Sequence, residues 1–392
     1  MAPKALAGVS RCVWDENDVD EITQIELACY FSFIDPGLAE SSHGPEEFWF
    51  RMGLYLNLDQ TGKLGPFSVE VSSYGNKPDV PKTEQVKSGT YDKYLSDRFN
   101  VAAVVTKDGE IIYERYDRKK RIDLNSQLFA ASFAKTAVST LVGGLFCDAH
   151  IMSLDDPASK YSEFLSSTQF GDITIRNLLQ MSSGVSMGRK FDEKRINQQT
   201  RGMRRYQGKG SARKALASFR GRAVAQGTRF EYHAADTLAL AVLAEDIVAS
   251  NLSKTFYESH FKKFSPTNHM RWLSDQNGTP AAFSDLTMSA RDWSAFGNYL
   301  LVEIKSGSCL GKFFQQGIDQ SVATGSNRIR YGFQSWVYEV KGDPVLVMRG
   351  HGGQFNVIMP NHDTVLTIIS IDENYKFGNL FAVIGELAEK VL

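Results

Sequence analysis

The sequence lacks the features that would place the protein in a membrane or on a nucleic acid. Its 392 residues contain no run of about 18 apolar residues, so we expect no membrane-spanning helix. The first residues have no apolar core of signal-peptide length, and this absence favours a cytoplasmic protein. The formal net charge of −1 gives no overall field that would attract nucleic acid or an anionic membrane surface.

Cysteine is also scarce. The four cysteines, Cys12, Cys29, Cys147 and Cys309, are scattered along the chain, and none belongs to a C-x-x-C pair. This spacing indicates neither a metal site nor a redox motif, and we expect no metal and no other cofactor. Because thiols stay reduced in the cytoplasm, we predict free cysteines.

The chain shows strand patterns at both ends and helical patterns in the middle. Residues 1–95 hold scattered Pro and Gly without a long periodic segment, and we interpret them as an N-terminal extension packed on the main domain. Two β-rich runs, 101–106 and 110–116, flank Asp108-Gly109 and predict a β-hairpin. A long helix is expected from Ser132 to Phe146, where apolar residues recur at helical spacing.

The C-terminal part returns to strands and closes with an amphipathic helix. The strand runs and the helix are 331–340, 345–348, 354–359, 364–370 and 377–392. We therefore predict an α+β domain over 96–392 in which an antiparallel sheet is flanked by helices. The sheet part comprises about 96–157 and 290–392, and a mostly helical subdomain covers about 158–289.

Ser132-Phe-Ala-Lys135 is an S-x-x-K motif at the start of the expected helix. Residues three apart lie on one face of a helix, so the lysine amine can reach the serine hydroxyl. A neutral or partly desolvated lysine can accept the serine proton and activate the oxygen as a nucleophile. The helix N-terminus also favours negative charge that develops at the serine. We predict Ser132 as the nucleophile and Lys135 as the group that activates it.

Spacing alone does not decide this assignment, because the S-x-x-K pattern occurs three times. Ser211 lies in an arginine-rich stretch, and Ser259 is followed by two lysines and a helix-breaking Ser-Pro pair. Only Ser132 opens a long apolar helix directly after a predicted hairpin. The structural alternative for Ser132 is an N-cap serine beside a lysine that extends to solvent.

A rival nucleophile is Ser186. Gly184-Val-Ser-Met-Gly188 matches G-x-S-x-G, the nucleophile elbow of α/β-hydrolases, and His351 lies downstream of it. That elbow must follow a buried strand and open a helix. Here the preceding segment has a helical pattern, and no alternating strands and helices surround it, so we keep Ser186 as the weaker alternative.

Two later segments can complete an acyl-transfer site. Tyr232 stands just before a predicted helix, and a tyrosine near a lysine can shuttle a proton to a leaving group. Taken alone, a packing role for this tyrosine is the simpler interpretation. Gly350-His351-Gly352-Gly353-Gln354 interrupts two strand runs. Such glycines permit close backbone approach, and a strand edge can present an N–H group to an oxyanion.

Taken in chain order, these motifs resemble the serine β-lactamase and penicillin-binding-protein superfamily, above all its class C and esterase-like branch. Leu154-Asp-Asp-Pro157 and the segment 173–184 are similar to further motifs of that branch. The most similar group is the 6-aminohexanoate-dimer hydrolases, the nylon-oligomer amidases. They have a segment similar to Tyr232-His-Ala-Ala-Asp236-Thr, with Asn in place of Asp236, and a late Gly-x-x-Gly-Gln similar to Gly350–Gln354.

The resemblance implies Ser132 as the acylated nucleophile and Lys135 with Tyr232 as the proton-transfer pair. It also implies an oxyanion hole formed by the N–H groups of Ser132 and of a late-strand residue, for which we nominate His351. Other residues that the resemblance assigns to the oxyanion and substrate-binding region are Gly350, Gly352 and Asp236.

Two departures from the branch concern antibiotic hydrolysis. The Y-x-N asparagine of class C β-lactamases is replaced by Ala234, and the K-T-G lysine is replaced in the Gly350 segment. Both changes disfavour β-lactamase activity, and neither removes the groups needed for acyl transfer. We therefore expect a serine hydrolase that cleaves a small amide or ester through an acyl-enzyme. A catalytically silent binding or scaffold protein of the same fold is the alternative.

The stretch from Arg189 to Arg222 holds twelve Lys or Arg against two acidic residues. This composition is typical of a solvated helical face, and it also leaves open a small substrate that is anionic. We expect no nucleic acid and no membrane as partner. A homodimer is left open.

Overall fold

The computed structural model describes residues 71–74, 95, 100–117, 122–185, 211–267, 269–275, 277–284, 286–326, 328–340, 342–350 and 352–370. Several sequence predictions lie outside these residues. They concern the rival nucleophile Ser186, the nominated oxyanion residue His351, the closing helix 377–392, most of the basic stretch and most of the N-terminal extension.

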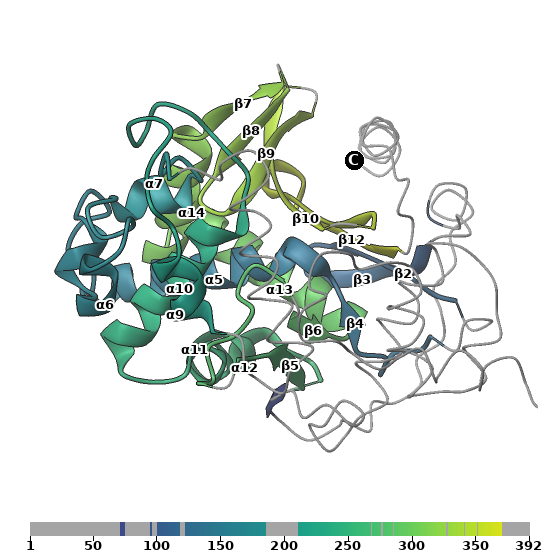
Figure 1. Ribbon diagram of the computed structural model, residues 1–392. Coiled ribbons are helices and arrows are strands. Elements are labelled where there is room, and N and C mark those ends of the chain that lie inside the picture. Colours follow the sequence, from purple (N-terminus) through teal and green to yellow (C-terminus); the bar gives the residue numbers. More distant parts are fainter. Residues whose placement is uncertain are drawn as a thin grey trace, which may run out of the picture.

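The larger sheet of the described residues is antiparallel and has eight strands, in the order β3-β2-β12-β11-β10-β9-β8-β7. The strands are β2 Asn100–Lys107, β3 Glu110–Tyr116, β7 Val322–Ser326, β8 Ile329–Gly332, β9 Ser335–Val340, β10 Asp343–Gly350, β11 Gln354–Met359 and β12 Thr364–Ser370. Strand β12 pairs with both β2 and β11, so early and late parts of the chain meet inside one sheet (Figure 1).

The predicted hairpin around Asp108-Gly109 is confirmed as β2 and β3. Asp108 (φ 52°) and Gly109 (φ 83°) both have left-handed backbone, the geometry of the tight hairpin turn that Asp-Gly favours. The single run predicted over 331–340 is instead two strands, β8 and β9. The chain turns between them at Phe333 and Gln334, neither of which is a glycine or proline, and Gly332 pairs with Ser335 across the turn.

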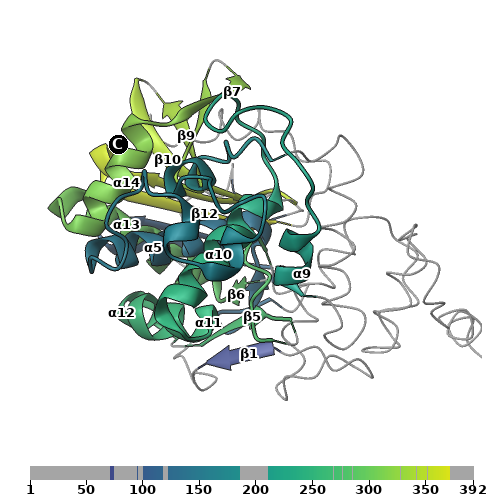
Figure 2. The same ribbon diagram turned by 60° about the vertical axis from the view of Figure 1, so that its left-hand side comes forward.

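The helices gather on one face of this sheet. They are α5 Ala134–Cys147, α6 Glu163–Ser166, α7 Ile175–Leu179, α9 Ala212–Ala217, α10 Ala234–Val248, α11 Leu252–Phe256, α12 Lys262–Phe264, α13 Ala290–Ser306 and α14 Cys309–Asp319. Helix α13 packs on β2, β11 and β12, whereas α5 contacts α10, α11 and α14 (Figures 1 and 2). None of the described helices is long and apolar enough to cross a membrane.

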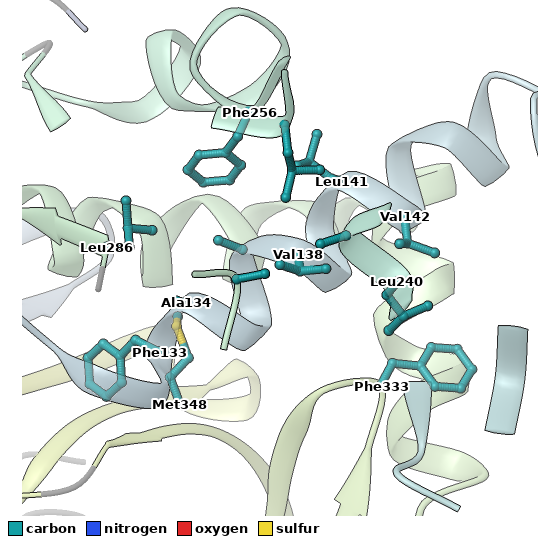
Figure 3. Packing of buried hydrophobic residues seen from close by; sticks show 14 of the residues in the cluster. Phe133, Ala134, Val138, Leu141, Val142, Leu240, Phe256, Leu286, Phe333 and Met348 are labelled. Carbon is teal, nitrogen blue, oxygen red and sulfur yellow. The ribbon is translucent and has the colours of Figure 1, made fainter. Parts of the chain in front are cut away.

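Helix α5 runs through the main hydrophobic core. Its apolar residues Ala134, Val138 and Val142 are fully buried, together with Leu240 of α10 and Met348 of β10 (Figure 3). The apolar spacing that predicted a helix from Ser132 therefore has a packing cause, because this helix is surrounded by other elements. The predicted α+β architecture, a sheet flanked by helices, is confirmed.

A second, smaller sheet has the strand order β1-β5-β6-β4. Its strands are β1 Val71–Tyr74, β4 Leu128–Phe129, β5 Met270–Leu273 and β6 Leu286–Met288. The part of the chain expected to be mostly helical thus also contributes two strands. Strand β1 comes from the predicted N-terminal extension and pairs with β5 of the main domain.

The prediction of free thiols is wrong for two of the four cysteines. Cys147 and Cys309 form a disulfide that joins the end of α5 to the start of α14. The two residues are 162 positions apart in the sequence, and their Cα atoms lie 5.7 Å apart. Sequence spacing could not reveal this pair, because only the packing of α14 against α5 brings the two helix ends together.

Candidate functional site

The backbone makes a sharp turn just before Ser132. Strand β4 ends at Phe129, and Ala131 has a left-handed backbone (φ 48°) although it is not glycine. Such a conformation costs an alanine about 1–2 kcal/mol, and tertiary contacts must hold it in place. The short 3₁₀ turn η3 (Ala131–Phe133) then leads into α5, so Ser132 stands at the N-terminal end of the long buried helix.

Ser132 and Lys135 are in direct contact. The Lys135 amine donates hydrogen bonds to Ser132 Oγ at 2.9 Å and to the carbonyl oxygen of Phe283 at 2.8 Å. Lys135 is only 4% exposed, whereas Ser132 is partly exposed. The serine oxygen can therefore meet a substrate while the amine beneath it is kept from bulk water.

Tyr232 lies close to the same amine. The Lys135 Nζ atom is 5.0 Å from the centroid of the Tyr232 ring. Tyr232 is 38% exposed, and its ring packs against Trp336 (centroids 5.2 Å apart) and Tyr331 (5.8 Å apart). The structure thus brings together Ser132, Lys135 and Tyr232 from two separate parts of the sequence.

The late strand reaches the same place. Gly350 ends β10, and a side-chain carbon built at Gly350 would lie only 2.4 Å from the Ala130 carbonyl oxygen. This position therefore requires glycine, because β10 passes directly against the backbone that precedes the nucleophile. Gly352 (φ 88°) lies in the turn that joins β10 to β11, whose first residues pair as Gly350 with Gln354. His351 lies outside the described residues.

Asp236 does not line the site. It is fully buried in the first turn of α10, where its carboxylate accepts a hydrogen bond from the Ser183 N–H at 3.4 Å. Burial raises the pKa of this carboxyl to about 8. The prediction that Asp236 contacts substrate is wrong for this structure, because the residue has no accessible surface. Through the hydrogen bond with Ser183, Asp236 connects α10 with the loop that follows α7.

The other two S-x-x-K serines have structural roles. Ser211 is the N-cap of α9, where its hydroxyl accepts a hydrogen bond from the Lys214 N–H. Ser259 donates to the carbonyl oxygen of Thr255, one helical turn earlier. Neither contact places a lysine amine on the serine hydroxyl. The segment before the rival Ser186 contains the helix α7 and no buried strand, so the described neighbourhood lacks the context of a nucleophile elbow.

Sequence reasoning missed three residues of the site. Phe283 supplies a carbonyl to Lys135, and Tyr331 and Trp336 hold the Tyr232 ring. No motif marks a backbone carbonyl, and the aromatic residues of β8 and β9 looked like ordinary strand residues. A cluster of three or more His, Cys, Asp or Glu that could hold a metal is not found among the described residues.

Comparisons with known proteins concern the family and the fold of the chain. The model of the family described as Beta-lactamase matches residues 91–378. No curated protein matches the chain. A candidate 6-aminohexanoate-dimer hydrolase from Bacillus anthracis has a similar structure, with a TM-score of 0.69, 17% identity and coverage of 96% of this chain and 98% of its own.

Two further solved structures are similar over about three quarters of the chain. A D-stereospecific amidohydrolase from Streptomyces sp. has a TM-score of 0.57, with 14% identity and coverage of 75% of this chain and 97% of its own. A class C beta-lactamase has a TM-score of 0.59, with 13% identity and coverage of 77% and 96%. At these identities the likeness concerns the fold.

Proposed function

Because the chain belongs to the beta-lactamase family, we propose that it is a serine hydrolase that cleaves a small amide or ester through an acyl-enzyme on Ser132. The observation that carries the proposal is the single amine of Lys135. It contacts Ser132 Oγ at 2.9 Å and faces the Tyr232 ring at 5.0 Å. One buried base thus lies close both to a nucleophile and to a phenol that can relay a proton.

The reaction would proceed in two halves. In acylation, Ser132 Oγ attacks the substrate carbonyl and its proton passes to Lys135. The Tyr232 hydroxyl gives a proton to the departing amine or alcohol and regains one from the Lys135 ammonium. In deacylation, water attacks the acyl-serine ester and loses its proton to the same pair. The acid product leaves and the Ser132 hydroxyl is restored.

The site favours an amidase or esterase over a β-lactamase. Ala234 is the first residue of α10 and offers only a methyl group where class C enzymes carry the substrate-binding asparagine. The serine, the lysine and the tyrosine, which acyl transfer needs, are all present. The similar hydrolase from Bacillus anthracis is described as acting on the 6-aminohexanoate dimer, and small linear amides are therefore a reasonable first substrate class for this chain.

An anionic substrate is part of the proposal. The guanidinium of Arg349, on β10, stacks over the Trp336 ring at 4.4 Å, and Trp336 in turn packs on Tyr232. A substrate carboxylate placed beyond the tyrosine would meet this cation, and an arginine is well suited to bind a carboxylate.

The cytoplasmic location stays a prediction. The disulfide between Cys147 and Cys309 argues against it, because such bonds persist in oxidising compartments.

Labelling with a fluorophosphonate, together with hydrolysis of a chromogenic ester, tests the proposed function. Wild-type protein should be labelled at Ser132, and Ser132→Ala should lose label and hydrolysis. Lys135→Ala should reduce the hydrolysis rate by about three orders of magnitude or more. Ser259→Ala is the matched control, because it removes a serine of the same motif that lies on another helix, and it should leave the rate unchanged.

Two outcomes would oppose the proposal. Undiminished hydrolysis by Ser132→Ala would exclude this nucleophile, and label at Ser186 would favour the elbow alternative. Folded wild-type protein that neither takes the label nor hydrolyses esters would favour the catalytically silent alternative.

A further inference from the structure

Gln334 occupies the turn between β8 and β9 in an unusual state. It is only 2% exposed, and its backbone is left-handed (φ 57°) although it is not glycine. A buried amide side chain must find partners for its donors and its acceptor, and strained backbone persists only where the surroundings hold it. Both facts indicate that the position of this residue is fixed by contacts on several sides.

The side chain of Gln334 joins two helices. Its Oε1 atom accepts a hydrogen bond from the Thr237 hydroxyl of α10 at 2.7 Å. Its Nε2 group donates to the carbonyl oxygen of Leu178 in α7 at 2.8 Å. The backbone N–H of Gln334 adds a bond to the Leu179 carbonyl at 2.8 Å, so the turn is bound to the end of α7 and to the helix that follows Tyr232.

The backbone of the same turn holds the helix of the nucleophile. Thr136, the residue after Lys135, donates its hydroxyl to the Gln334 carbonyl at 3.2 Å and lies 3.0 Å from the Ser335 hydroxyl. One buried residue therefore contacts α5 next to Lys135 and α10 close to Tyr232. Helices α5 and α10 also pack on each other, so a change in this link would alter how they meet.

The strands on either side of Gln334 carry the aromatic support of the tyrosine. Tyr331 precedes the turn and Trp336 follows it, and both rings pack on Tyr232 at 5.8 Å and 5.2 Å. Tyr331 is fully buried. The hairpin therefore fixes the tyrosine ring from one side while Gln334 fixes its helix.

We propose that Gln334 is a positioning residue that holds the Tyr232 phenol at the distance from Lys135 needed to deliver a proton to the leaving group. This inference rests on the proposed serine hydrolase function. The inference concerns one step of that function. Gln334 should matter for breaking the bond to a poor leaving group, not for the attack of Ser132.

Gln334→Asn is the test variant. Asparagine tolerates left-handed backbone, but its amide is one methylene shorter and cannot reach both Thr237 and Leu178. Small displacements of a catalytic group cost about 10²-fold in rate. Single-turnover acylation by butyryl p-nitroanilide, whose amine must be protonated to leave, should therefore fall by about 10²-fold. Acylation by p-nitrophenyl butyrate, whose phenolate leaves unaided, should fall by less than about threefold.

Gln180→Asn is the matched control. Gln180 is also a buried glutamine, at the end of α7, and its amide donates to the Gln320 carbonyl at 2.7 Å, away from α5 and α10. This variant should lower both acylation rates equally or not at all. Thr237→Val removes only the hydroxyl that donates a hydrogen bond to Gln334 Oε1. If Gln334→Asn does not fold, the anilide and ester rates of Thr237→Val are compared instead.

A double-mutant cycle with Tyr232→Phe completes the test. Because Gln334 is proposed to act through Tyr232, Gln334→Asn should slow the anilide no further in the Tyr232→Phe background. Equal losses on ester and anilide, or full additivity with Tyr232→Phe, would overturn the inference. Wild-type protein that releases neither p-nitrophenol nor p-nitroaniline would instead overturn the proposed function.

Discussion

Removal of the disulfide between Cys147 and Cys309 should destabilise the fold without changing the chemistry. The bond closes a loop over a sequence separation of 162 residues. A crosslink of this span lowers the entropy of the unfolded chain by an amount worth about 5 kcal/mol at 25 °C. Whole domains are stable by about 5–15 kcal/mol, so the double variant Cys147→Ser/Cys309→Ser should lose a large part of its stability.

The catalytic end of α5 should be spared. Cys147 ends the helix and Ser132 precedes its start, roughly 20 Å away at 1.5 Å per residue. Core packing on α10, α11 and α14 holds the helix between them. Ester hydrolysis per folded molecule should therefore equal that of the wild type in the absence of denaturant.

Urea unfolding, followed by tryptophan fluorescence with and without reductant, measures the effect. Cys309 is exposed, so a reductant can reach the bond. The wild-type midpoint should fall by about 1 M urea or more on reduction, and the double variant should already have the lower midpoint and ignore reductant. In a Cys12→Ser/Cys29→Ser control, thiol titration in denaturant should find no free thiol. Two free thiols there, with unchanged midpoints, would refute the reasoning.

Three other perturbations have directions set by the structure. Burial raises the pKa of Asp236 to about 8, so its carboxyl binds a proton more tightly in the folded chain than in the unfolded chain. The stability of the fold should therefore fall as the pH rises from about 4 to 8. Asp236→Asn should raise the melting temperature more at pH 8 than at pH 5, and equal shifts would contradict this. Arg349→Ala should raise KM about three- to tenfold for an ester whose acyl group ends in a carboxylate, and an equal change for an uncharged ester would exclude carboxylate binding. Arg291→Met would leave the buried Glu114 carboxylate without its guanidinium partner, which lies at 2.6 Å. The free energy of unfolding, measured with urea, should fall by about 3–5 kcal/mol. Adding Glu114→Gln should recover most of this loss.

The parts of the fold that follow local rules could be predicted from the sequence. Asp108-Gly109 indicated a hairpin because few residues tolerate left-handed backbone, and the two runs at 354–359 and 364–370 became β11 and β12 with the same bounds. Ser132 could be preferred over two other S-x-x-K serines because only Ser132 opens a long apolar helix.

The features that depend on distant contacts could not be predicted in this way. Gln334 has no turn-forming character, and its left-handed backbone is held by Thr237, Leu178 and Thr136. Asp236 resembled a substrate contact by its place near Tyr232, yet the helix turns it away from solvent. The sequence names these residue types but does not contain the packing that gives them their roles.

Strand β12 has a consequence for the synthesis of this protein. It is the last described strand, and it lies between β2, one of the earliest, and β11. A nascent chain that has just left the ribosome tunnel with β2, β3 and α5 would still lack the strand that joins them to the rest of the sheet. The sheet can therefore close only after β12 has been synthesised, and until then the exposed edge of β2 would be open to chaperones or to aggregation.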